Sequence, residues 1–305
     1  MNDTLSWPTP AVRSTTILRW SFPAELGGLT LQGTSVAADH TSFSIPELNW
    51  MLDAGVLVDT QRPTHIFVSH THTDHVHMLT HLKTRRKPPK IYAPAACAPM
   101  IETYLSAAQA MTANILWTPE VNWTRAYDMV PVTGGQRLDL TRGKKKYVAE
   151  VFDCDHTLPC VGYIFSEVRR KLKTQYADTP GHELGALRAK GIDISEETPI
   201  PLFAYLGDTR PSVYESAPEI FGAPVVIAEC SFISDDHKAH AQRTGHTVWS
   251  DLLPIVEAHP ETIFVLIHFS KRHREHELRA FFEQHAPPNV VPWINGNAQP
   301  QEAVA

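Results

Sequence analysis

Short apolar runs separated by polar turns recur along the first sixty residues. Such runs, rich in β-branched and aromatic residues and bounded by glycine-containing turns, predict antiparallel strands of one sheet. The predicted strands are Thr15–Phe22, Leu29–Gly33, Thr41–Ile45 and Trp50–Leu52.

Apolar runs then alternate with stretches of helical character. Predicted strands follow at Ile66–Ser69, Lys90–Ala93, Ile115–Trp117, Gln136–Leu140, Lys146–Asp153, Val161–Phe165, Leu202–Leu206, Val225–Ala228 and Ile263–Ile267. Predicted helices run from His75 to about Arg86 and over Ala95–Ala110, Val248–Ala258 and Glu275–His285. Twice along the chain, a run of strands is followed by strands that alternate with helices. This order predicts an α+β sandwich of two sheets with helices outside. We expect one domain over residues 15–285.

One internal segment differs from this pattern. Residues 167–200 are polar and charged, so we expect a short arm that leaves the core, with a helix near Glu183–Lys190. The ends, residues 1–14 and 286–305, contain prolines and few apolar runs and are expected to be loose.

Composition excludes several classes of protein. The chain has 305 residues, 43% hydrophobic and 20% charged, as in a globular protein with a substantial core. No apolar run approaches the roughly 18 residues of a membrane span, and the N-terminus has no secretory pattern, so we expect no membrane contact and a cytoplasmic location. The four scattered cysteines fit a reducing compartment. A net charge of −6 means that any RNA binding must use local basic patches.

The run His70-Thr71-His72-Thr73-Asp74-His75 gathers four ligand-type side chains between a predicted strand and a predicted helix. Imidazole and carboxylate suit Zn²⁺, and Mn²⁺ or Fe²⁺ can occupy the same ligands. The chain has 17 histidines, so the alternative is a histidine-rich surface loop. Two ligand pairs on one loop favour a two-metal centre, as in phosphoryl displacement.

Further ligand-type residues each follow an apolar run, where a strand would deliver them to a sheet edge. They are His156, Asp208, Glu229 and His268. Together with the first motif they complete two shells: His70, His72 and His156 for one ion, and Asp74, His75 and His268 for the other. Asp208 would bridge the two ions, with a hydroxide in the remaining shared position. Glu229 and His246 are left for proton transfer.

These residues resemble the metallo-β-lactamase superfamily, whose signature is an H-x-H-x-D-H loop with a later His, Asp and His. Within it, Gly207-Asp208-Thr209, Glu229-Cys230-Ser231-Phe232, Gly245-His246 and His268-Phe269-Ser270-x-Arg272 resemble the ribonuclease Z family of tRNA 3′-end endonucleases. The likeness is closest to the short nuclear form of plants, which shares a Lys-Leu-Lys run, here in Arg170–Tyr176. The resemblance implies an αβ/βα four-layer sandwich, two zinc ions, a homodimer, and catalytic roles for Glu229, His246 and the ligand Asp74. If the chain is eukaryotic, it also admits a nuclear location.

The chain departs from the bacterial type of this family, which carries a long Gly-Pro-rich arm that grips tRNA. Residues 167–200 offer only Pro180-Gly181. The basic side chains of this arm are nevertheless the candidate tRNA contacts, namely Arg169, Arg170, Lys171 and Lys173. Arg272 either meets a substrate phosphate or pairs with a carboxylate.

The sequence therefore predicts a metal-dependent endonuclease that removes the 3′ trailer from precursor tRNA by attack of a metal-bridging hydroxide. One alternative is a small-molecule phosphodiesterase, for instance on cyclic nucleotides, with the same metal centre. A redox diiron protein is disfavoured, because such relatives have Glu in place of His72. A non-catalytic metal-binding RNA-binding module would be expected to lack ligands, and none is missing.

Overall fold

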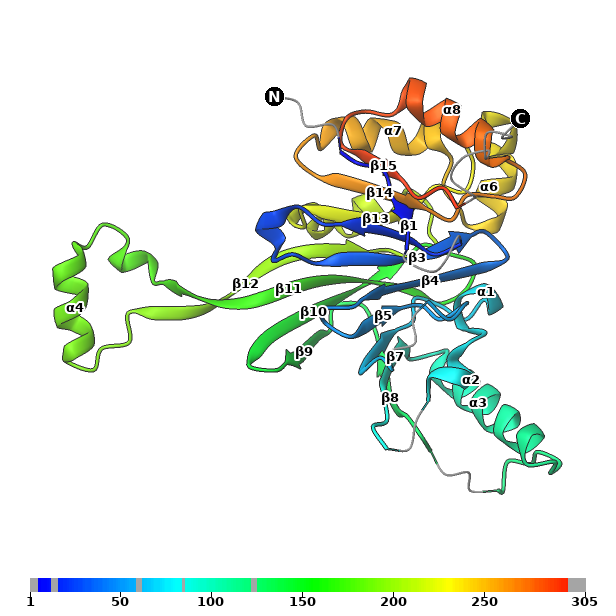
Figure 1. The fold of residues 1–305 in the computed structure, drawn as a ribbon, viewed down its shortest axis with the longest axis horizontal. Helices are drawn as coiled ribbons and strands as arrows, with labels where there is room; N and C mark the ends of the chain where they lie inside the picture. Colours follow the sequence, from blue (N-terminus) through cyan, green and yellow to red (C-terminus); the bar gives the residue numbers. More distant parts are fainter. Residues whose placement is uncertain (1–4, 12–15, 59–61, 84–85, 122–124, 296–305) are drawn as a thin grey trace, which may run out of the picture.

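The computed structural model describes residues 5–11, 16–58, 62–83, 86–121 and 125–295, which Figure 1 draws as ribbon. The N-terminal sheet has its strands in chain order. Neighbours are antiparallel from the first to the fifth strand and parallel from the fifth to the eighth. The strands are β1 (Thr9–Pro10), β2 (Leu18–Ser21), β3 (Thr30–Val36), β4 (His40–Ile45), β5 (Trp50–Leu52), β6 (His65–Phe67), β7 (Lys90–Pro94) and β8 (Asp128–Val132).

The second sheet has the order β15-β14-β13-β12-β11-β10-β9. It too is antiparallel at first, from β9 to β12, and parallel from β12 to β15. Its strands are β9 (Arg137–Arg142), β10 (Lys145–Cys154), β11 (Cys160–Leu172), β12 (Ser195–Tyr205), β13 (Val225–Glu229), β14 (Ile263–Ile267) and β15 (Val290–Pro292).

Helices cover the outer faces of both sheets (Figure 1). The α-helices are α1 (Thr73–Val76), α2 (Leu79–Leu82), α3 (Ala98–Thr112), α4 (Gly181–Ala189), α5 (Val213–Ser216), α6 (Lys238–Thr244), α7 (Trp249–Ala258) and α8 (Glu275–His285). Short 3₁₀ turns lie at η1 (Ala24–Leu26), η2 (Thr174–Tyr176), η3 (Pro218–Gly222) and η4 (Asp235–His237).

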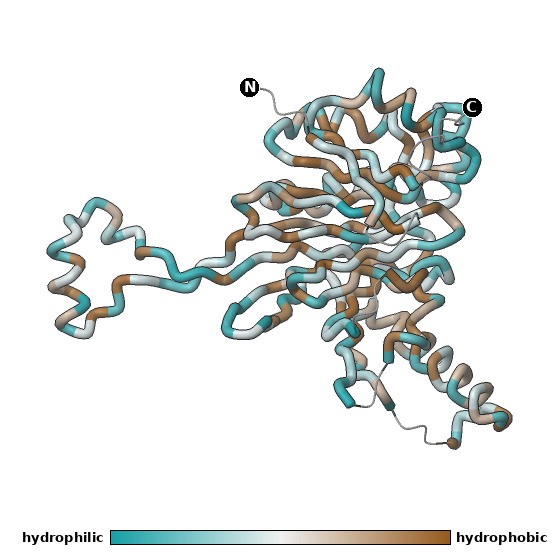
Figure 2. Tube along the Cα trace, in the orientation of Figure 1, coloured by the Kyte–Doolittle hydropathy of each residue, from teal (hydrophilic) through white to brown (hydrophobic). Residues whose placement is uncertain are grey.

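Three apolar clusters separate four layers. The central one packs side chains of the two sheets against each other, such as Phe67 against Phe165. On the outer faces, Ile66 of β6 packs with Ile101 of α3, and Phe264 of β14 packs with Leu252 of α7. Strands buried on both faces carry continuous apolar runs, which Figure 2 shows as brown central segments. The expected αβ/βα sandwich is confirmed.

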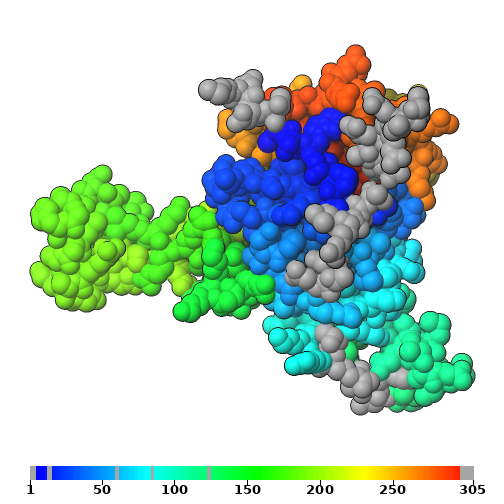
Figure 3. All heavy atoms as spheres, in the orientation of Figure 1, coloured from blue at the N-terminus to red at the C-terminus, as the bar shows by residue number. Residues whose placement is uncertain are grey.

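The expected arm is a two-stranded ribbon with a helix at its end. Strands β11 and β12 continue outward as paired strands as far as Leu172 and Ser195, and α4 lies at the tip, to the left in Figure 1. Figure 3 shows it standing clear of the body. No residue of α4 is buried.

Two elements were predicted wrongly. The helix expected from His75 to about Arg86 is two short helices, α1 and α2. The backbone of Ala54 bonds to both His75 and Met78, which fixes the chain between the helices. The strand expected at Ile115–Trp117 is absent, and Leu116 is 86% exposed. The strand that completes the first sheet is β8 instead.

Both ends are more ordered than expected where they are described. Thr9 and Pro10 pair with β2, and β15 pairs with β14. Trp293 and Ile294 are buried, so the expected loose tail is wrong for these residues. The Pro287-Pro288 pair ends α8 and leads into β15. Residues 1–4, 12–15 and 296–305 lie outside the described part.

Candidate metal centre and general acid

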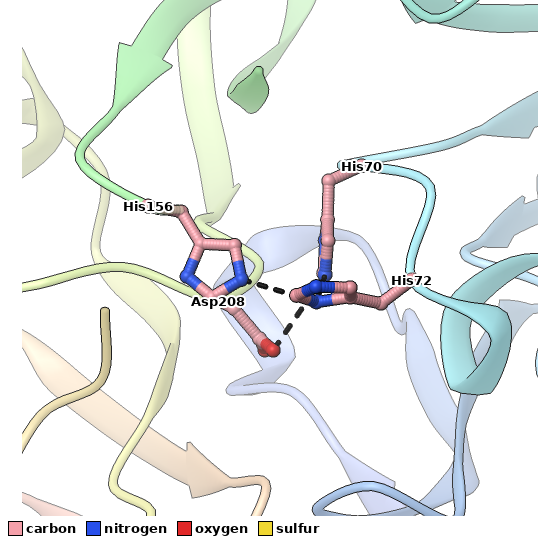
Figure 4. Close-up of side chains that lie close together, drawn as sticks. All are labelled: His70, His72, His156 and Asp208. Carbon is pink, nitrogen blue, oxygen red and sulfur yellow. Dashed lines mark hydrogen bonds and ion pairs between the residues drawn. The ribbon is translucent and has the colours of Figure 1, made fainter. Parts of the chain in front are cut away.

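Four loops and one short helix bring the predicted ligands together at one edge of the two sheets. His70 and His72 follow β6, His156 follows β10, and Asp208 follows β12. Figure 4 shows these four side chains pointing toward one another. Gly207, before Asp208, has φ +69°, and a Cβ there would lie 2.5 Å from the Cβ of Ser69. Glycine therefore lets the Asp208 loop approach the His70 loop.

The first ligand group is His70, His72, His156 and Asp208. The Nδ1 atom of His72 lies 3.0 Å from Nε2 of His70 and 3.2 Å from Nε2 of His156. Metal–nitrogen bonds of about 2.0–2.1 Å in a tetrahedron place neighbouring ligand atoms about 3.3 Å apart. The three nitrogens therefore have the spacing of a shared ion.

The second group is Asp74, His75 and His268. Nε2 of His75 lies 3.4 Å from Nε2 of His268, and Oδ2 of Asp74 lies 3.7 and 3.5 Å from these two atoms. His268 has φ +66°, an unusual value for a residue other than glycine that is common at functional sites.

Asp208 lies between the two groups. Its Oδ2 is 3.7 Å from Nε2 of His70, 3.5 Å from Nε2 of His75 and 3.3 Å from Nε2 of His268. Its Oδ1 is buried and has no hydrogen-bond partner among the described residues. Burying a carboxylate oxygen without a partner costs free energy, and a bound cation would supply that partner.

The hydrogen bonds on the far side of each ring fix where its lone pair points. Nδ1 of His156 lies 2.8 Å from the carbonyl of Gly245, and Nδ1 of His75 lies 2.7 Å from Oδ2 of Asp53. Both acceptors require an N–H, so each Nε2 of the neutral ring carries a lone pair.

Serine hydroxyls accept the Nδ1–H of His70 and of His268 and so leave the Nε2 lone pair of each neutral ring free. Ser69 donates its hydroxyl to Asp53, so it accepts from Nδ1 of His70 at 3.0 Å. Ser231 donates to Glu229 and accepts from Nδ1 of His268 at 3.1 Å. With both rings neutral, the Nε2 lone pairs of His75 and His268 face each other, so a metal ion or a proton must lie between them. Burial opposes the charge of His75, but Asp208 and Asp53 outweigh burial and raise the pKa of His75 well above its ordinary value, so a proton takes this position when no ion is bound. The residues thus fit metal ions in both groups.

Asp53 is a residue of the candidate site that sequence reasoning missed. This fully buried carboxylate accepts from Ser69 N and Oγ at 2.7 Å each, from His75 Nδ1 and from the hydroxyl of Tyr205. It therefore holds two of the candidate ligand rings. The available signal was an acid directly after the apolar run Trp50–Leu52, the same pattern that selected Asp208.

Burial and neighbouring charges shift the pKa values of these groups. Burial lowers the pKa of His70 well below its ordinary value, and His75 adds to the effect. Burial also lowers the pKa of His72 and His156. Burial raises the pKa of Asp74, but His268 and His75 in their protonated forms outweigh burial and lower this pKa to about 2. Neutral imidazoles and an ionised carboxylate are the ligand forms of these groups.

The buried Glu229 and the half-buried His246 form a pair beside both ligand groups. Nδ1 of His246 lies 2.8 Å from Oε1 of Glu229. Burial lowers the pKa of His246, but the charge of Glu229 and its hydrogen bond outweigh burial and raise this pKa to about 9. Since Nδ1 is held by Glu229, Nε2 is the atom left to exchange a proton. The ring lies 5.2 Å from that of His156 and 5.3 Å from that of His268, measured between centroids.

The expected RNA contacts on the arm lie apart from this centre (Figure 1), and most of them have partners within the arm. Arg169 pairs with Glu167 at 2.6 Å, Arg170 pairs with Asp193 at 2.6 Å, and Lys173 donates to the carbonyl of Asp193 at 2.7 Å. Residues 167–200 contain six acidic and six basic side chains. Arg272 is exposed, four residues after His268.

Residues 41–269 match the family described as the "Beta-lactamase superfamily domain". The curated relatives include "tRNase Z TRZ2, chloroplastic" of Arabidopsis thaliana, 28% identical over 84% of this chain and 71% of the relative. They also include "tRNase Z TRZ1" of the same plant, 24% identical over 87% of this chain and 93% of the relative.

Among solved structures, the metallo-β-lactamase fold protein YhfI of Bacillus subtilis superposes with a TM-score of 0.52. It is 13% identical and covers 95% of this chain and 93% of its own, so the likeness concerns the fold. Within the described residues, no helix combines the length and apolar character needed to cross a bilayer.

Proposed function

Because the chain belongs to the β-lactamase superfamily domain family, we propose that it is a metal-dependent phosphodiester hydrolase of the ribonuclease Z type. Its substrate is precursor tRNA, from which it removes the 3′ trailer. One observation carries the proposal. The ligand histidines converge on the shared carboxylate of Asp208, and His246, held by Glu229, lies beside them. The curated relatives named tRNase Z supply the substrate class.

We assign two divalent ions to the two ligand groups, with Asp208 shared. Zinc is the ion proposed, since five imidazoles and two carboxylates suit it, and Mn²⁺ or Fe²⁺ would accept the same ligands. Bound divalent ions would lower the pKa of a coordinated water and neutralise charge on the scissile phosphate.

The chain's own contribution to the reaction is proton transfer and orientation. His246, protonated at neutral pH and held through Nδ1 by Glu229, is placed to give a proton from Nε2 to the leaving 3′-oxygen. General acid catalysis of this kind contributes about 10²–10⁴ in rate. The His246→Ala variant should therefore keep its metal and lose most of its activity, whereas Asp208→Ala should lose both.

For tRNA binding we propose the arm and Arg272. The arm stands outside the sandwich (Figure 3), where it is free to contact a substrate far from the cut. Lys171 is exposed, and its cross-strand neighbour in the ribbon is Glu196. Arg272 lies close in sequence to a candidate ligand and is the proposed phosphate contact near the centre.

A small-molecule phosphodiesterase on the same centre is the second candidate. The equal number of acidic and basic side chains in residues 167–200 favours it, because RNA-binding surfaces are usually strongly basic. Such an enzyme would use the same ligands and the same His246.

One experiment separates the two candidates. Protein with measured metal content is incubated with a 3′-extended tRNA, with a 3′,5′-cyclic nucleotide and with bis-p-nitrophenyl phosphate, each with and without chelator. The proposal expects a single mapped cut at the 3′ end of the acceptor stem, abolished by chelation. Hydrolysis of the cyclic nucleotide with intact tRNA would contradict it.

Two further features are proposed with this function. A homodimer is supported by exposed apolar side chains at the end of α3 and after it, including Met111, Ile115 and Leu116. Light scattering after gel filtration would report a mass of twice 34.1 kDa. The proposed location is the cytoplasm, or the nucleus as in the relative named "Nuclear ribonuclease Z" of Triticum aestivum, and a fluorescent fusion would test it.

A further inference from the structure

Two of the four cysteines face each other across neighbouring strands. Cys154 ends β10 and Cys160 begins β11, and the two are directly paired in the antiparallel register. Paired residues of antiparallel strands have Cα atoms about 4.5–5.5 Å apart, within the range of about 4.4–6.8 Å that a disulfide requires. Cys160 is buried and Cys154 is half-buried. An oxidant can therefore reach one thiol with the other beside it.

Each thiol also supports the candidate metal centre. Sγ of Cys154 donates to the carbonyl of Leu206 at 2.9 Å, and Sγ of Cys160 donates to the carbonyl of Asp208 at 3.3 Å. The chain between the two cysteines carries His156. The pair thus joins the segment that carries His156 to the segment that carries Asp208.

The other two cysteines are differently placed. Cys97 contacts Thr71 and the carbonyl of Pro159, and Cys230 contacts the carbonyl of Phe232. Both are fully buried. Neither has another cysteine among the hydrogen-bond partners found for the described residues.

We propose that Cys154 and Cys160 are a modification site, which a peroxide converts to a disulfide that weakens metal binding. The Cys154 thiolate attacks the peroxide O–O bond to give a sulfenic acid and hydroxide. The Cys160 sulfur then attacks the Cys154 sulfur, forming the S–S bond and releasing water. Two thiols are oxidised, and one peroxide is reduced to two waters.

The disulfide removes both S–H donors. The carbonyls of Leu206 and Asp208, on residues that are 0% and 1% exposed, then lose their thiol partners. The His156 loop is closed covalently at the same time. Because outer contacts of this kind typically change metal affinity about 10–100-fold, we expect a loss of at least about tenfold. This second part rests on the proposed metal centre, whereas the disulfide itself does not.

The test is thiol mapping on the whole chain. Metal-free and zinc-loaded protein is treated with a small excess of hydrogen peroxide, alkylated with N-ethylmaleimide and digested. The expected product has lost two hydrogens, carries a Cys154–Cys160 peptide pair and leaves Cys97 and Cys230 alkylated. Reduction with dithiothreitol before alkylation gives four alkylated cysteines again. Zinc titration shows weaker binding to the oxidised protein than to the reduced protein.

Serine variants provide matched controls, because a hydroxyl can still donate to the same carbonyls. Cys154→Ser and Cys160→Ser should each form no disulfide and keep zinc affinity through peroxide treatment. A Cys97→Ser, Cys230→Ser double variant should still form the bridge. Three results would overturn the proposed site. They are four alkylated thiols after treatment, a bridge to Cys97 or Cys230, and Cys154 found only as sulfinic acid. A bridge with unchanged zinc affinity would overturn its effect on the centre. Neither readout uses RNA, so a failure of the proposed nuclease function would be seen separately.

Discussion

At the scale of single residues, the centre is defined by what each imidazole does with its outward nitrogen. Gly245 O, Asp53, Ser69 and Ser231 each take an N–H from one ligand ring. In the neutral rings of these four histidines the Nε2 lone pair is thereby turned inward, whereas His72 presents Nδ1. Such outer partners set ligand orientation and metal affinity.

The Asp53→Asn variant tests this directly. An amide presents two N–H groups where Asp53 accepts four hydrogen bonds, so donors would face donors at His75 or Tyr205. We expect zinc affinity to fall about 10–100-fold and the free energy of unfolding to fall by roughly 1–3 kcal/mol. Isothermal titration and urea unfolding measure the two. Asp39→Asn is the control, because that carboxylate is half exposed and pairs with Lys271 at 3.3 Å. Wild-type zinc affinity in Asp53→Asn would show that the outer contacts do not set the ligands.

The pair of Glu229 and His246 predicts a pH dependence. The acid form of His246 is present below its pKa of about 9 and is lost as the pH rises through that value. The turnover number should therefore fall on the alkaline side. Glu229→Gln removes the charge that raises this pKa, so the fall should move to lower pH by about one to three units.

The measurement is kcat against pH for wild type and Glu229→Gln. Asp251→Asn, which alters a surface ion pair with Lys238, serves as control and should leave the profile unchanged. An alkaline limb that stays in place in Glu229→Gln would remove His246 from the role of general acid.

The sequence predicted the candidate ligands but not the contacts that hold them. His70 to His75 form a compact motif, and His156, Asp208 and His268 each end an apolar run, so local pattern was sufficient. Ser69 and Tyr205 lie 16 and 152 residues from Asp53. No local pattern predicts such a network, because only the packing of the two sheets brings these residues together.

At the scale of elements, the ribbon β11–β12 connects the core to the arm. Its pairing continues from Tyr163 opposite Tyr205 to Leu172 opposite Ser195 with one register shift near Phe165. The sequence predicted the arm from its polarity but ended both strands at the core. Apolar periodicity is lost where the ribbon becomes exposed, so the strands were drawn too short. Strand β15 was missed for a different reason: it is only three residues long and closely follows Pro287-Pro288.

Replacing residues 174–193 by an Asn-Gly turn tests the arm as an element, because Lys173 and Ile194 are opposite each other in the ribbon. The turn would close the hairpin after Lys173 and leave the core strands paired. We expect KM for 3′-extended tRNA to rise at least about tenfold, with hydrolysis of bis-p-nitrophenyl phosphate unchanged, since substrate binding alone is removed. Equal losses on both substrates would show a structural role for the arm.

A single side chain on the ribbon gives a finer test. Lys171→Gln removes one exposed cation of the proposed RNA surface, and Lys144→Gln, in the exposed turn between β9 and β10, removes one elsewhere. Only the first should raise KM for precursor tRNA, by about two- to tenfold, and both should leave bis-p-nitrophenyl phosphate hydrolysis unchanged. The same KM in both variants would locate RNA binding outside the ribbon.

At the scale of the whole molecule, the two sheets meet so that the ends of β6, β10, β12 and β14 deliver their residues to one edge. The centre is thus assembled by tertiary packing, and residues 193 positions apart, His75 and His268, come within 3.4 Å. A net charge of −6 makes the body a poor general binder of RNA. Recognition of tRNA must then depend on few contacts.

The most direct test of the proposed two-ion centre is anomalous scattering at the zinc absorption edge from crystals grown with zinc. The structure predicts two peaks in each chain. One should lie among Nε2 of His70, Nδ1 of His72 and Nε2 of His156, and the other among Asp74, His75 and His268, with Asp208 touching both. A single peak, or peaks remote from these atoms in protein that cleaves precursor tRNA, would contradict the two-ion centre.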